Sequence, residues 1–118
     1  MITWAAIVFA IAALGGATLA ILHFRGRTPL PMPLALLHGL LAASGLVLLI
    51  AAALTQPGFG GLALVALVIF VIAALGGFYL FAHHLRGKPL PSPVVVIHGS
   101  AAVVAFLLLL GFIFKVQF

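Results

Sequence analysis

The sequence predicts an all-α membrane protein with four transmembrane helices, built as a tandem parallel repeat of a two-helix hairpin. Three observations predict this fold: the composition, the length of the apolar tracts and an internal duplication. The chain of 118 residues is 67% hydrophobic and only 4% charged, whereas the surface of a soluble domain is about a quarter to a third charged. Transmembrane β-strands would alternate apolar and polar residues, and these tracts do not alternate.

Each apolar tract is close to the roughly 20 residues that a helix needs to cross the hydrocarbon core of a bilayer. The tracts cover residues 2–24, 33–55, 60–84 and 93–114. The first tract lacks the basic n-region of a signal peptide and is echoed by the third, so we expect it to be a mature helix. Prolines in the two intervening turns cannot continue a helix.

The duplication is visible in residues other than the lipid-facing leucines and alanines. Residues 5–27 align with residues 66–88 and, after one extra residue in the first copy, residues 29–49 align with residues 89–109. The informative matches are a Gly-Gly pair, a histidine, an Arg-Gly pair, a Pro-Leu-Pro-x-Pro segment and a His-Gly pair. The sequence therefore encodes the same helix–turn–helix unit twice.

This duplication predicts a single bundle over residues 1–118, with one repeat at 1–56 and the other at 57–118. Because each repeat contains two helices, both copies enter the membrane in the same sense, which predicts a pseudo-twofold axis along the membrane normal. Short turns favour antiparallel neighbours. The first and third helices, and the second and fourth, should therefore lie on the diagonals of the bundle.

Most of the basic residues lie in the two Pro-rich turns. Arg25, Arg27, Arg86 and Lys88 are found there, against Lys115 and the N-terminus on the opposite side. The excess of basic residues predicts that the Pro-rich turns are cytoplasmic. The expected location is a bacterial inner membrane, with both termini on the periplasmic side.

Several classes of function are excluded by the residues that the chain lacks. Without cysteine there can be no disulfide, thiolate ligand or iron–sulfur cluster. Without Asp or Glu there is no carboxylate base or carboxylate metal ligand. The five cations are too few to form a nucleic-acid-binding face. No nucleophile–base arrangement is present, so an electron carrier or accessory subunit is favoured over an enzyme.

The histidines are the candidate functional residues, because an ionisable residue inside a membrane span is a functional-site hypothesis by default. His38 and His98 lie deeper in their helices and are expected to be ligands. His23 and His84 are nearer the interface, where they could equally be anchors or phosphate contacts.

Small residues accompany these histidines at helical spacing. Gly16 and Gly77 precede His23 and His84 by seven residues, and Ala42 and Ala102 follow the deeper pair by four. We expect them to line a space beneath the histidines. The alternative is close helix packing, which small residues promote in membranes.

A b-type haem with His38 and His98 as axial ligands would account for these features together. Neutral imidazole binds haem iron, copper and zinc, and a flat macrocycle needs the space that small residues leave. The anionic propionates would meet Arg25 and Arg86 on the cytoplasmic side, with His23 and His84 as further partners.

In its four helices and paired helix histidines, the chain resembles the four-helix membrane b-type cytochromes. It differs from their diheme pattern, in which one helix carries two histidines near opposite faces, because the outer half of this chain has no histidine. The resemblance implies haem-mediated electron transfer, as part of or partner to a respiratory complex.

Two other functions remain open from the sequence. The four paired histidines could form a tetrahedral copper or zinc site if they converge on one ion. Alternatively, the chain could be a non-redox accessory or scaffold subunit whose histidines bind lipid headgroups or a partner. The expected surroundings are the lipid bilayer and a redox partner or larger membrane complex, and a homo-oligomer is possible.

Overall fold

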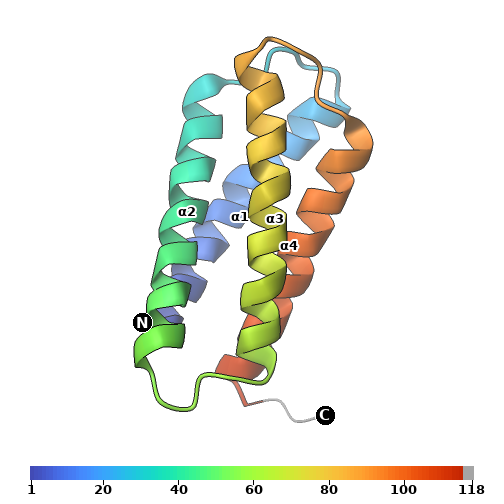
Figure 1. Cartoon of the computed structure of the whole chain (residues 1–118). Coiled ribbons are helices and arrows are strands. Elements are labelled where there is room, and N and C mark those ends of the chain that lie inside the picture. The colour runs from blue at the N-terminus through green and yellow to red at the C-terminus, as the bar shows by residue number, and fades with distance from the viewer. Residues whose placement is uncertain (116–118) are drawn as a thin grey trace.

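The computed structural model describes residues 1–115 and is a bundle of four α-helices (Figure 1). Residues 116–118, at the end of the second predicted repeat, lie outside the described residues. The helices are α1 (Ile2–Phe24), α2 (Met32–Thr55), α3 (Leu62–Leu85) and α4 (Ser92–Ile113). Their bounds agree with the four predicted tracts to within two residues, and no strand is found among residues 1–115. The predicted all-α fold is confirmed.

All four helices are long and apolar enough to cross a membrane. Helices of 22 to 24 residues are about 33–36 Å long at 1.5 Å per residue, which covers a hydrocarbon core of about 30 Å. Large apolar side chains cover the outside of the bundle, as Leu54 and Leu14 show with exposed fractions of 80% and 71%. A contiguous apolar surface of this kind belongs in lipid, so the chain is an integral membrane protein.

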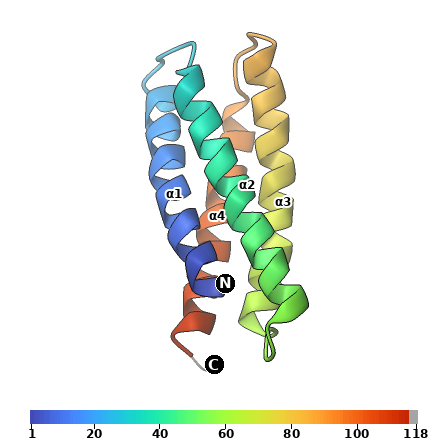
Figure 2. The ribbon, with the colours of Figure 1, turned by 90° about the vertical axis from the view of Figure 1, so that its left-hand side faces the viewer.

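Each helix packs against two neighbours. α1 packs most extensively on α2, and α3 on α4, while α1 also contacts α4 and α2 contacts α3. The remaining pairs, α1 with α3 and α2 with α4, lie on the diagonals, as the short turns predicted. Figures 1 and 2 show the two Pro-rich turns at one end of the bundle and both termini at the other.

The repeated Arg-Gly pairs end α1 and α3 in the same way. Gly26 and Gly87 have φ angles of +73° and +65°, a left-handed conformation that glycine adopts without steric cost. Both turns form a Schellman motif, which satisfies helix carbonyls that would otherwise lack a partner. Its hydrogen bonds run from Gly26 N–H to His23 O, Arg27 N–H to Leu22 O, Gly87 N–H to His84 O and Lys88 N–H to His83 O.

Residues at equivalent positions of the two repeats supply most of the core. The members of each pair are buried together: Ala5 with Ala66, Phe9 with Phe70, Ala12 with Ala73, Gly45 with Ala105, and Leu49 with Leu109. The two phenylalanine rings stack across the bundle between the diagonal helices α1 and α3, with centroids 4.0 Å apart and planes 4° from parallel. Both halves of the chain therefore contribute to one shared core.

Candidate imidazole pair in the membrane

His38 and His98, called the imidazole pair below, lie at the same depth in the bundle. Each is the seventh residue of its helix, which places it about 9 Å from the helix start at the Pro-rich end. Both side chains are half-buried. They come from the diagonal helices α2 and α4, and their ring centroids are 6.3 Å apart with planes at 88°. The structure therefore brings the two deeper histidines close to each other.

Each imidazole is anchored to the backbone of the helix beside it. Nδ1 of His38 lies 2.8 Å from the carbonyl oxygen of Ala12 in α1, and Nδ1 of His98 lies 2.7 Å from that of Ala73 in α3. A carbonyl oxygen can only accept, so Nδ1–H is the donor in both bonds. In the neutral ring the lone pair then resides on Nε2, which is the state of a metal-ligating histidine whose orientation is fixed by a second hydrogen bond.

Repeated glycines give the imidazoles their room. A Cβ atom on Gly16 would stand 2.8 Å from Cε1 of His38, and one on Gly77 would stand 3.0 Å from Cε1 of His98. The preceding glycines are also close, since a Cβ on Gly15 would lie 3.5 Å from Cβ of His38. The Gly-Gly pairs thus let the backbones of α1 and α3 approach the rings. The space that Gly16 and Gly77 were expected to line beneath the histidines is, at these two residues, filled by the imidazoles themselves.

The Phe9–Phe70 stack fills the centre of the bundle between the imidazole pair and the end that carries the termini. Phe9 lies one turn from Ala12, whose carbonyl holds His38, and a Cβ on Gly45 would come within 3.0 Å of the Phe9 ring. Ala42 and Ala102 lie one turn beyond the imidazole pair and are half-buried. The imidazole pair is consequently separated from the far end of the bundle by aromatic packing.

The two outer histidines do not join the imidazole pair. Nε2 of His23 is 2.9 Å from the hydroxyl of Ser92, which links α1 to α4. His84 instead lies parallel to Phe81, with centroids 6.2 Å apart, and the residue equivalent to Ser92 in the first repeat is Met32. Within residues 1–115, no three side chains of the metal-ligating types approach closely enough to hold one ion. The tetrahedral four-histidine site is therefore not formed.

Arg25 and Arg86 are the C-cap residues of α1 and α3 and are exposed. They lie at the same end of the bundle as the imidazole pair. Since the chain contains no Asp or Glu, neither arginine has a carboxylate side chain to pair with.

The fifth histidine, His83, bonds within its own helix. Its Nδ1 lies 3.0 Å from the carbonyl oxygen of Tyr79, and the two rings are 4.6 Å apart. Neither of these contacts is with the imidazole pair.

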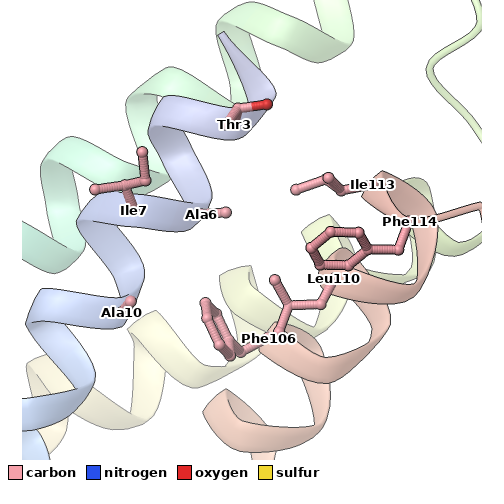
Figure 3. Close-up of a pocket in the computed structure, with 8 residues that line it drawn as sticks. All are labelled: Thr3, Ala6, Ile7, Ala10, Phe106, Leu110, Ile113 and Phe114. Atoms are coloured by element: carbon pink, nitrogen blue, oxygen red, sulfur yellow. The ribbon is translucent and has the colours of Figure 1, made fainter.

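A separate groove of about 230 Å³ lies between α1 and α4 near the termini (Figure 3). Its lining residues are apolar except for the hydroxyl of Thr3, and none of them is a histidine: Thr3, Ala6, Ile7, Ala10, Phe106, Leu110, Ile113 and Phe114. The groove is not part of the imidazole site.

Comparisons with protein-family models, with curated proteins and with solved structures each found no match. Of the features implied by the resemblance to membrane b-type cytochromes, only the four membrane-spanning helices are confirmed. The chemistry of the site must be read from its own residues.

The sequence alone did not reveal what holds the imidazoles. Their hydrogen-bond acceptors are the backbone carbonyls of Ala12 and Ala73, and a backbone acceptor requires no particular side chain. The repeated Gly-Gly pair was visible in the sequence as a sign of close approach. In the structure, however, Gly16 and Gly77 lie against His38 and His98 of the neighbouring helices, and not against the histidines of their own helices.

Proposed function

We propose that this protein binds one b-type haem between His38 and His98 and carries electrons in the membrane. The observation that supports this most strongly is the pair of imidazoles held through Nδ1 on carbonyls of the adjacent helices. This arrangement leaves Nε2 of each ring as the available ligand atom.

The spacing of the rings agrees with two ligands on one metal. Two metal–nitrogen bonds of about 2.0–2.1 Å, together with the radius of each ring, place two opposed imidazole centroids roughly 6–6.5 Å apart. The observed separation is 6.3 Å. A shorter distance would leave no room for an ion between the rings, and a much longer one would prevent joint ligation.

The diagonal helices α1 and α3 would seat the proposed ligands. At the level of the imidazoles they carry Gly-Gly pairs, and the rings of His38 and His98 lie against Gly16 and Gly77. The Phe9–Phe70 stack would exclude water from the terminal side, and Arg25 and Arg86 would meet the propionates at the Pro-rich end. When bound, a haem of this kind supplies reversible one-electron chemistry.

A single site near one membrane surface does not span the bilayer. We therefore propose a redox partner or a larger respiratory assembly that receives the electron, and we place the Pro-rich turns in the cytoplasm of a bacterial cell, on the basis of their excess of basic residues.

Bare copper or zinc is less well supported. Only two imidazoles lie close to each other, whereas structural zinc sites use four protein ligands, and residues 1–115 bring no third ligand to the pair. A purely scaffolding role would not require the matched anchoring of both rings.

The test is the absorption spectrum of the purified membrane protein. We expect a Soret band and a sharp α-band on reduction, and loss of both in His38→Ala and in His98→Ala. His83→Ala is the matched control, because it removes an imidazole that touches neither ring of the pair, and it should keep the spectrum. A colourless wild-type protein from haem-sufficient cells would refute the proposal, and metal analysis of that protein would then decide between copper or zinc and a scaffold.

A further inference from the structure

We propose that the Pro-rich end of the bundle binds the phosphate groups of anionic phospholipids, with Arg27 and Lys88 as the principal contacts. This proposal concerns a surface outside the imidazole site and does not depend on any cofactor.

Four of the five Lys and Arg residues of the chain lie at this end: Arg25, Arg27, Arg86 and Lys88. All four are exposed. Both views of the bundle place their two turns at the same end (Figures 1 and 2). The result is a concentrated positive charge at one end of an otherwise apolar cylinder.

The backbone presents Arg27 and Lys88 in the same way. Each is the residue after the left-handed glycine of a Schellman motif, and its N–H group donates to a carbonyl of the preceding helix at 3.0 Å. α2 and α4 begin directly after these turns, and neither has a side-chain cap on its first N–H groups. The positive ends of these two helices add to the charge of the side chains.

No group within the described protein neutralises this charge, because the sequence has no Asp or Glu. The counter-charge must therefore come from outside the chain. Arg27 and Lys88 each stand three residues beyond the last residue of a membrane-spanning helix, which places them at the depth of the lipid headgroups. An arginine guanidinium matches a phosphate with two parallel hydrogen bonds, and a lysine ammonium binds it as a point charge.

The depth of the two residues favours lipid over an acidic soluble protein. A phosphodiester is already present at that depth on every side of the bundle, whereas a soluble partner would have to reach short turns that hardly rise above the headgroups. Basic residues next to a membrane-spanning helix are attracted to anionic leaflets by about fivefold in affinity per residue.

The experiment measures the association of spin-labelled phosphatidylglycerol and phosphatidylcholine with the whole protein in bilayers, by electron paramagnetic resonance. For the wild type we expect a clear preference for phosphatidylglycerol that declines at high salt. In the double variant Arg27→Gln, Lys88→Gln the preference should fall severalfold, towards unity. Lys115→Gln is the matched control, since it removes one cation at the opposite end of the bundle, and it should keep most of the preference.

Equal preferences in the wild type and the double variant would overturn the proposal, as would an equal loss in Lys115→Gln. Displacement of the labelled lipid by millimolar inorganic phosphate would assign the surface to free anions instead. If the double variant fails to fold, the salt dependence of the wild-type preference decides, because a preference that does not change with salt is not electrostatic. The haem spectrum is recorded on the same samples, so failure of this proposal and failure of the proposed function can be told apart.

Discussion

Adding one methyl group at Gly16 should disturb the imidazole site more than the same change elsewhere in the bundle. A Cβ atom there would stand 2.8 Å from Cε1 of His38, a distance that real Cβ atoms essentially never show. The ring cannot simply swing away, because its Nδ1 is held by the carbonyl of Ala12 at 2.8 Å. Either this hydrogen bond or the packing of α1 on α2 must give way.

The expected change in the unfolding free energy of Gly16→Ala follows from two opposing effects. Overpacking of a well-packed site typically costs about 1–3 kcal/mol, whereas replacing glycine by alanine inside a helix gains about 1 kcal/mol. Gly39→Ala provides the matched control, since it lies in the same helix as His38 and a Cβ there meets nothing within 4 Å. It should gain stability, and Gly16→Ala should be less stable than this control by about 1–3 kcal/mol.

The assay is unfolding of the purified protein in mixed detergent micelles, combined with the Soret absorbance of each variant. We expect Gly16→Ala to lower the unfolding free energy and, if the proposed function holds, the Soret absorbance. Gly77→Ala, with its slightly longer contact of 3.0 Å, should have a smaller effect. Gly16→Ala with the stability and spectrum of Gly39→Ala would refute the reasoning, because the imidazole would then have room that the structure does not show.

Three further predictions test other parts of the structure. Phe9→Ala removes one ring of the central stack and should lower the unfolding free energy by about 3–5 kcal/mol, measured by the same titration; a loss below about 1 kcal/mol would mean that the stack contributes little. Ser92→Ala should cost about 0.5–1.5 kcal/mol through loss of the hydrogen bond between Ser92 and His23, and a double-mutant cycle with His23→Ala should show coupling, whereas strictly additive losses would speak against that bond. Because the chain has no cysteine, single replacements Thr28→Cys and Gln56→Cys allow clean labelling in intact cells with a membrane-impermeant maleimide, and we expect only Gln56→Cys to react; labelling of Thr28→Cys alone would reverse the proposed topology.

The outer histidines His23 and His84 occupy equivalent positions in the sequence alignment of the two halves, but they make different contacts. His23 is hydrogen-bonded to Ser92 across the α1–α4 contact, while His84 faces the ring of Phe81 in its own helix. The difference arises because the second hairpin begins α4 with a serine, where the first has Met32. One side of the Pro-rich end is therefore tied by a side-chain hydrogen bond that the other side cannot form.

Much of the fold could be predicted because the membrane imposes strict conditions on a sequence. A spanning helix must be apolar along its whole length and must satisfy its own backbone hydrogen bonds. Each long apolar tract of the sequence therefore predicted one membrane-spanning helix. The approach of His38 to His98 was expected from the hairpin duplication inferred from the sequence, since equivalent residues would then lie on diagonal helices at equal depth.

The sequence by itself determined the four spans, the repeated turns and the residue types near the Pro-rich end, because hydrophobicity, proline and glycine act locally. The tertiary structure alone decided which groups touch. It turned Nδ1 of each deep histidine towards a backbone carbonyl, set Gly16 and Gly77 against the imidazoles, and kept His23 and His84 apart from them. These contacts depend on how far one helix is rotated and shifted against the next, and on carbonyl groups that every residue carries, so no pattern of side chains could have specified them.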